Sequence, residues 1–345
     1  MLKAKRVLWG EGMFLRPQHF QQQALFSGNA VAEALQTVQR HPWGLRRFEF
    51  DTALLRDGLI HPHALEVTFH DGTRFAAPGN EPLPLSRDLN DLPQVGVTTT
   101  LYACLPNLDP YGANTANAET PPSRPARYKS AHQTVSDLYT RALEADLSTL
   151  ELDVRLMMEE ERRDGYDSVP IARLAKDATG HWQQDEDWLP PMVSVGATPI
   201  LPRIIRRLLS ILLVKSNALA AVHGERAKNI AGFGSADVTS FWMLHTVNHH
   251  FAVLNHLIEA TPLHPEELYL ALATFCGELI TFSSAYTLTS LPPYRHDDLS
   301  GTFLKLDEII RELLDTVISS RYVMVPLTSP KPSFYIGHLD SERLI

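Results

Sequence analysis

The hydrophobic pattern of this chain changes its period near residue 199, and this change constrains the fold more than any other feature. In several short runs before that point, apolar and polar residues alternate, which is the period of half-buried β-strands. After it, apolar residues recur at spacings of three and four, which is the period of amphipathic helices. Strands followed by helices predict an α+β fold, and 345 residues allow two or three domains.

The first half contains several candidate strands with no long helix between them. Residues 65–69 alternate strictly, and the Asp71-Gly72 pair that follows is typical of a hairpin turn. Further alternating runs cover residues 97–101, 150–156 and 169–174, and the run 150–156 is the most regular. Short strands of this kind predict an N-terminal β-sandwich domain over residues 1–195.

Four amphipathic stretches in the second half predict a helical bundle over residues 196–320. One helix is expected to begin near Ser235, and Pro265 stands where the first turn of another tolerates proline. The last two stretches alternate spacings of three and four, which suits a seam between chains and equally packing inside one bundle. Both alternatives remain open. The candidate seam residues are Leu268, Leu272, Phe275, Leu306, Ile310, Leu313 and Val317.

The last part of the chain, residues 321–345, is expected to form a separate extended segment. Tyr322, Met324 and Pro326 begin it, and an apolar run follows at residues 334–336. So few residues cannot build an independent core. The segment is therefore expected either to pack onto the bundle or to begin a further domain.

The opening segment, residues 7–23, carries more apolar side chains than a free terminus normally exposes. Aromatic and methionine side chains are typical of the centres of protein interfaces. They are equally suited to tie the terminus to its own domain, so both alternatives stand. The candidate partner-binding residues are Trp9, Glu11, Met13, Phe14, Leu15, Pro17, Gln18, His19 and Phe20.

Composition excludes several classes of protein. The net charge of −9 disfavours binding to nucleic acid, which needs clustered Lys and Arg. No uncharged run reaches the roughly 20 residues of a bilayer span, and no signal peptide is recognisable. Cys104 and Cys276 are far apart in sequence and are expected to be reduced thiols. These features indicate a cytoplasmic protein without membrane insertion.

No strong catalytic motif occurs in the sequence. The glycine patterns of phosphate-binding loops and of serine hydrolases are absent. His245 and His249 stand four residues apart and could bind zinc from one helix face, but the glutamate of an H-E-x-x-H motif is missing. We therefore expect no enzyme and no cofactor. A metal-dependent hydrolase using His245 and His249 is kept as the alternative.

Several motifs of the chain, taken in their order and spacing, resemble one family. They are the run Trp9 to Gln21, Pro42-Trp43-Gly44, Tyr166 to Ala172, Leu189-Pro190-Pro191, His264 to Tyr269, Gly277-Glu278-Leu279, Leu291 to Tyr294 and Asp297-Asp298-Leu299. Together they are similar to the TssK family, also called VasE or ImpJ, of baseplate adaptors in bacterial type VI secretion. The similarity runs from residue 7 to about residue 327.

The resemblance implies a homotrimer with three parts. An N-terminal β "shoulder" similar to that of phage receptor-binding proteins docks on the baseplate wedge, and a helical "neck" follows. A C-terminal "head" reaches the inner-membrane complex, and this chain departs from the family in lacking almost all of it. The implied location is the cytoplasm at the inner face of the inner membrane. A phage-tail structural protein is a further alternative, which differs only in the particle that it joins.

Overall fold

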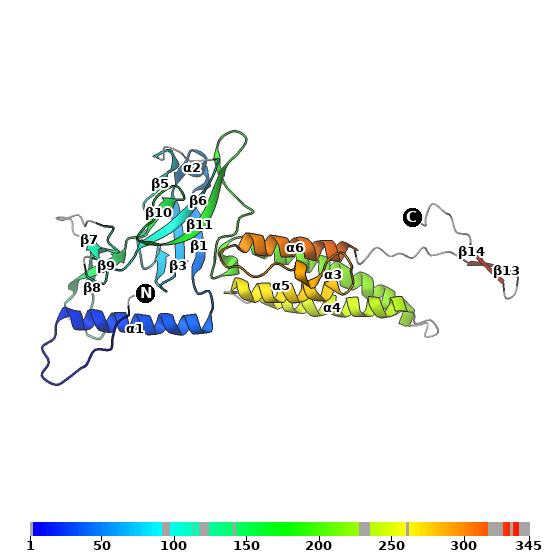
Figure 1. Ribbon diagram of the computed structural model, residues 1–345, viewed down its shortest axis with the longest axis horizontal. Helices are drawn as coiled ribbons and strands as arrows, with labels where there is room; N and C mark the ends of the chain where they lie inside the picture. Colours follow the sequence, from blue (N-terminus) through cyan, green and yellow to red (C-terminus); the bar gives the residue numbers. More distant parts are fainter. Residues whose placement is uncertain are drawn as a thin grey trace.

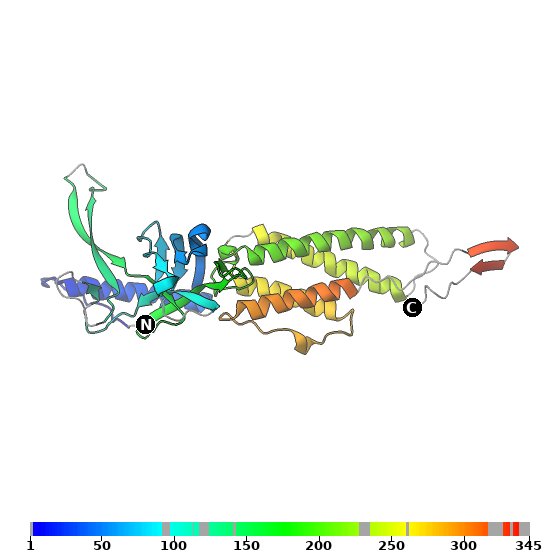
Figure 2. The same cartoon turned by 90° about the horizontal axis from the view of Figure 1, so that it is seen from above.

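The computed structural model describes residues 3–91, 97–112, 114–116, 124–140, 143–227, 235–259, 262–316, 327–331 and 334–337. Small β-sheets and one long helix make up the N-terminal part, and four long helices run side by side in the next part (Figures 1 and 2). The expected α+β class is confirmed. The helices among the described residues lack the combination of length and apolar character that a membrane crossing needs.

The N-terminal part begins with a helix and continues with strands. Its elements are α1 (Pro17–Val38), β1 (Gly44–Phe50), α2 (Thr52–Arg56), β2 (Leu59–Ile60), β3 (Pro62–Thr68), β4 (Arg74–Ala77), β5 (Arg87–Asp88), η1 (Leu89–Asp91), β6 (Thr98–Pro106), β7 (Thr115–Ala116), β8 (Tyr128–Val135), β9 (Ala145–Leu152), β10 (Arg155–Met158), β11 (Tyr166–Lys176) and β12 (Trp182–Gln184). The second part is helical. Its elements are η2 (Val195–Ala197), α3 (Ile200–Ala227), α4 (Ser235–Glu259), α5 (Pro265–Ile280), η4 (Leu288–Ser290) and α6 (Leu299–Thr316). The short strands β13 (Leu327–Lys331) and β14 (Phe334–Gly337) pair with each other.

Two antiparallel sheets share the core of the N-terminal part. One has the order β1-β3-β4 and the other β10-β6-β11-β12. Both contribute fully buried side chains to one apolar cluster, among them Leu65 and Phe75 from the first sheet and Leu101 and Ile171 from the second. Burying each such side chain stabilises the fold by roughly 1.5–3 kcal/mol.

The predicted hairpin after residue 69 is confirmed. Strands β3 and β4 pair in register, and Gly72 adopts a φ of 86° in the turn between them. The same turn approaches α1, because a Cβ on Gly72 would lie 2.9 Å from the Cβ of Ala32. The hairpin therefore positions α1 as well as connecting two strands.

The prediction of one strand over residues 150–156 is wrong. The alternation continues through the stretch, but the chain leaves one sheet after β9 and enters another at β10. Asp153 stands at the break, with a buried carboxylate that lies 2.5 Å from Lys129 Nζ and 2.5 Å from a guanidinium nitrogen of Arg155. A buried charge needs such partners. The weaker run at residues 169–174 belongs to β11, the longest strand described.

The second part of the chain forms a four-helix bundle, as its four amphipathic stretches predict. The described part of α4 starts at Ser235, and Pro265 occupies the first position of α5 as expected. Asp307 of α6 is buried, and its carboxylate lies 2.5 Å from Arg207 of α3 and 3.1 Å from Arg311. This ion-pair network ties α3 to α6 beside the apolar core.

The predicted seam between chains requires a correction. Six of its seven residues are 0–1% exposed in a single chain, so they have no surface left for a second chain. These six residues are Leu268, Leu272, Phe275, Leu306, Ile310 and Leu313. Val317 lies outside the described residues, as do Tyr322, Met324 and Pro326. These six residues therefore pack inside one bundle, which is the second of the two alternatives.

Candidate partner-binding surfaces

The residues that precede Pro17 lie alongside α1 and run in the opposite direction to it. The Arg6 guanidinium lies 5.3 Å from the centre of the Phe26 ring, and the Trp9 ring lies 6.2 Å from that of Phe20. The chain then reverses direction at Gly12, which has a φ of 76°. Figure 1 shows the resulting loop at the start of α1, at the end of the molecule away from the bundle. The segment is therefore held by α1.

The first turn of α1 is fixed by its own sequence. Pro17 occupies the first helical position, where its missing N–H removes no hydrogen bond. The backbone N–H of Arg16 donates to Nδ1 of His19 at 3.0 Å, and the N–H of His19 donates to the carbonyl of Arg16 at 3.0 Å. His19 therefore caps the helix, which is a structural role for one predicted partner-binding residue.

Most of the predicted partner-binding residues are exposed. The exposed fractions are 49% for Trp9, 80% for Phe14, 53% for Leu15 and 57% for Phe20. Glu11, Pro17 and Gln18 are also exposed, whereas Met13 and His19 are half-buried. The segment thus presents aromatic and aliphatic side chains to solvent on a defined backbone, and its aromatic contacts are to α1 rather than to the sheet core.

The helices of the bundle also expose large hydrophobic side chains. Six such side chains are 44–69% exposed. They are Leu213 and Val214 on α3, Val238, Phe241 and Trp242 on α4, and Leu270 on α5. We call these six residues the neck patch. Sequence periodicity missed them, because they lie off the apolar stripes that mark the buried faces of these helices.

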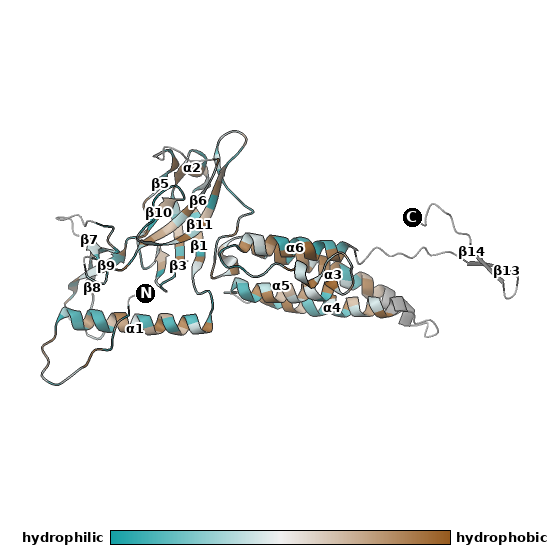
Figure 3. Ribbon diagram, viewed as in Figure 1, coloured by the Kyte–Doolittle hydropathy of each residue, from teal (hydrophilic) through white to brown (hydrophobic). Residues whose placement is uncertain are grey.

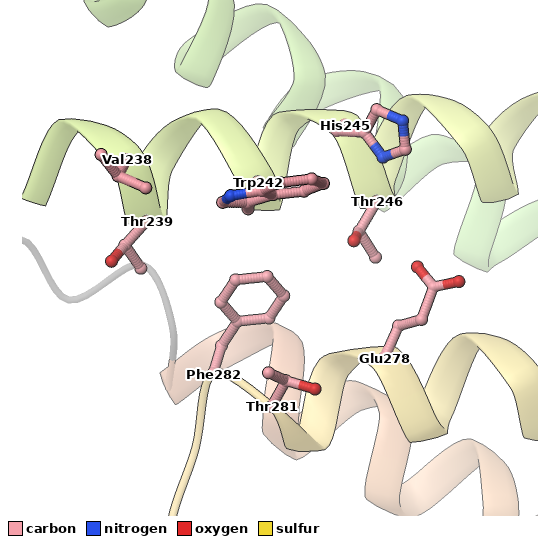
Figure 4. A pocket seen from close by; sticks show the side chains of 8 residues that line it. All are labelled: Val238, Thr239, Trp242, His245, Thr246, Glu278, Thr281 and Phe282. Carbon is pink, nitrogen blue, oxygen red and sulfur yellow. The ribbon is translucent and has the colours of Figure 1, made fainter.

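A pocket lies between α4 and α5 (Figure 4). Trp242 and Thr246 line it from α4, Glu278 from α5, and Phe282 from the segment after α5. His245 also lines it, and its ring is stacked with that of His249 at a centroid distance of 6.4 Å.

The histidines of α4 do not come together as the zinc hypothesis expects. Among the described residues, the group whose ligand atoms lie within 4.8 Å of one another is His249, His250 and Glu278, without His245. The donors that lie close together are therefore not the His245 and His249 pair of the zinc hypothesis. His250 is buried, and burial lowers its pKa. Its Nε2 lies 3.2 Å from the Glu278 carboxylate, which links α4 to α5.

Aromatic rings join the bundle to the sheets. His296 lies between His41 and His264, with ring centroids 4.8 Å and 5.6 Å away and nearly parallel planes. Its Nε2 lies 2.9 Å from the carbonyl oxygen of Trp43, and its Nδ1 lies 2.8 Å from the hydroxyl of Tyr294. Burial lowers the pKa of His296 to about 4, so the ring is neutral at pH 7. We call these five residues the junction stack.

The backbone beside the junction stack is equally constrained. Gly44 has a φ of 126°, and a Cβ there would lie 2.7 Å from the carbonyl of Pro191. The N–H of Leu45 donates to that carbonyl at 2.8 Å. Motifs far apart in the sequence, including Pro42-Trp43-Gly44 and Leu189-Pro190-Pro191, therefore meet at one place. Spacing alone did not reveal this role, although the same motifs carried the resemblance.

Comparison with known proteins agrees with that resemblance. The family model for bacterial type VI secretion proteins of the EvfL, ImpJ and VasE type matches residues 19–345. The type VI secretion system baseplate component TssK1 of Pseudomonas aeruginosa is 32% identical over 344 residues, which are 99% of this chain and 76% of that protein.

Solved structures show the same likeness. The chain is similar to one in the cryo-electron microscopy structure of a TssK-TssF-TssG baseplate subcomplex, with a TM-score of 0.81 and 30% identity over 91% of this chain and 100% of that chain. It is also similar to one in a baseplate complex from the type VI secretion system, with a TM-score of 0.87 and 30% identity over 99% of this chain and 76% of that one. The chain therefore belongs to the TssK family, also called VasE or ImpJ, and is a structural component of the type VI secretion baseplate.

Proposed function

We propose that this protein is a homotrimeric connector whose opening segment binds the baseplate wedge. The exposed aromatic and aliphatic side chains on a fixed backbone, residues 9–20, are the observation that carries this proposal. The corresponding chain in a similar structure is in a complex with TssF and TssG, so these two proteins are the proposed wedge partners. No catalytic activity is part of the proposal.

The opening segment is suited to such a contact because its backbone needs little further ordering when a partner binds. Trp9 already contacts Phe20, and the helix cap fixes the residues that follow. Phe14 and Leu15 stand at the turn between segment and helix, where they are 80% and 53% exposed. Burying each of them against a partner would contribute roughly 1.5–3 kcal/mol. In a preorganised surface, the loss of conformational entropy on binding offsets less of this free energy.

The three parts of the proposed connector follow the elements of the chain. Residues 1–195 form the shoulder, in which the two sheets act as the β-sandwich, and residues 196–320 form the neck. Residues 321–345 are proposed as the start of the head. The link to the inner-membrane complex, and with it a cytoplasmic position at the inner face of the inner membrane, is proposed for the head of the assembled protein.

For the contacts between three chains we propose the neck patch. Its side chains are large, apolar and 44–69% exposed, unlike the six buried residues of the earlier seam. Trimer formation would remove them from water and cover the pocket beside Trp242. The exposed charged side chains of α6 belong to a helix that contributes no residue to the neck patch. This arrangement suits an interface with an apolar centre and charged residues outside it.

The experiment that tests the wedge contact replaces Phe14 and Leu15 together with serine. We expect co-purification with TssF and TssG to fall at least about tenfold while the melting temperature changes by less than about 3 °C, because both side chains are exposed. The matched control is Leu85→Ser, since Leu85 is 84% exposed elsewhere on the N-terminal part. A collapse of the melting temperature with unchanged binding per folded trimer would show that the segment is core and would refute the contact.

A further inference from the structure

One face of α1 carries an apolar stripe that no described part of its own chain covers. Its members follow spacings of four, three, four and three, the heptad spacing of a coiled-coil seam. They are Ala24, Gly28, Val31, Leu35 and Val38, which we call the α1 stripe. Val31 is 62% exposed, Leu35 50% and Val38 86%. In Figure 3, brown positions recur along this helix.

The other faces of α1 are already in use. Ala32 is buried against the β3–β4 turn at Gly72, and Asn29 is buried on the same side. Arg6 covers Phe26, which at 100° per residue lies nearly opposite the α1 stripe. Trp9 contacts Phe20, which lies on the same face as the stripe, one turn before Ala24. The opening segment therefore contacts this face at Phe20, and the α1 stripe continues the face from Ala24 onward.

The charge of α1 indicates what occupies the stripe. Glu33 is the single Asp, Glu, Lys or Arg residue among the 22 residues of the helix. Exposed helices normally carry many charges on the side that meets water. A helix almost without charge can lie beside a copy of itself without repulsion, whereas a strongly charged partner would find no complement. Ala24 and Gly28 also permit a close approach of two helices.

We propose that the α1 stripe packs against the α1 stripe of a second copy of this chain. The proposal rests on the homotrimer proposed above, and it names a contact of the shoulder in addition to the neck patch. Two heptads are too few to hold chains together alone. The stripe therefore acts as one part of a larger interface, and it sets how the shoulders meet.

Cysteine cross-linking of the full chain tests this contact. The native Cys104 and Cys276 are buried, so an introduced cysteine is the reactive one. In a Val31→Cys variant we expect a short bismaleimide to join most chains in pairs. The matched control is Glu33→Cys, because residue 33 lies on the opposite side of the same helical turn, and it should give less than about one tenth of the cross-linked product.

The mass of each variant is measured first by sedimentation. A trimer in which Val31→Cys and Glu33→Cys cross-link equally or not at all would overturn the α1 contact and leave the trimer standing. A monomer would overturn both. Cross-linking that is absent from the free trimer, together with protection of the introduced cysteine from maleimide only after TssF and TssG are added, would assign the stripe to the wedge and would also refute the proposal.

Discussion

At the scale of single residues, burial and hydrogen bonds decide what the histidines of this chain do. His19 looked like a partner contact in the sequence, yet its Nδ1 accepts the hydrogen bond that caps α1. His296 had no predicted role, yet it is 3% exposed at the centre of the junction stack. His19 takes the place of the Glu or Gln of the usual capping box, and the Trp43 carbonyl beside His296 comes from a distant part of the chain. Such roles were therefore beyond sequence reasoning.

The junction stack makes stability depend on pH. Burial lowers the pKa of His296 to about 4, whereas an unfolded histidine titrates near 6.5. Between these values the unfolded chain binds the extra proton, so stability is complete above about pH 6.5 and falls as the pH drops toward 4. The total effect is roughly 3 kcal/mol. We expect His296→Gln to lose this part of the pH dependence in urea unfolding at about pH 7 and about pH 5.

The control for this prediction is His132→Gln, which changes an exposed histidine on β8. Its unfolding should keep the pH dependence of the unchanged chain. Burial also lowers the pKa of His250 and of His264, so some dependence remains in every variant. An identical slope in His296→Gln and in the unchanged chain would show that the junction stack does not titrate as described.

At the scale of elements, hydrophobic periodicity predicted the features that the local sequence specifies. The β3–β4 hairpin and the start of α5 agree with the sequence because turn and cap residues specify them locally. The division between β9 and β10 was missed because alternation continues across Asp153 while the chain changes sheets. A spacing of three and four likewise cannot tell whether the facing helix belongs to the same chain. The buried seam residues and the exposed α1 stripe show that one spacing occurs in both settings.

The neck patch gives the prediction at this scale. Replacing Leu213 and Val214 with glutamate should raise the dissociation constant of the trimer at least about tenfold, because three copies would bury six charges. Both side chains are at least 50% exposed in the single chain, so the bundle itself should remain folded. Sedimentation equilibrium measures the dissociation constant and circular dichroism the fold. As a control, Arg206→Glu changes an exposed residue of the same helix; equal effects of both changes would argue against an apolar contact.

At the scale of the whole molecule, a connector needs surfaces at separate places and a stiff body between them. The opening segment contacts α1, and the neck patch residues belong to helices α3, α4 and α5 of the bundle. Figure 1 shows α1 and the bundle at separate places in the molecule. The junction stack and the Gly44–Pro191 contact fix the sheets to the first turns of the bundle. The sequence predicted the order of these parts and the candidate opening segment. It could not give the place where they meet, since that depends on contacts between distant motifs.

The central claim is that the opening segment is the wedge contact, and hydrogen–deuterium exchange on the full chain tests it most directly. Exchange is compared for the free protein and for its complex with TssF and TssG. We expect amides of residues 7–16, which lie outside α1, to be protected at least about tenfold in the complex, with little change in the helices of the bundle. Unchanged exchange at residues 7–16 in a fully formed complex would contradict the claim.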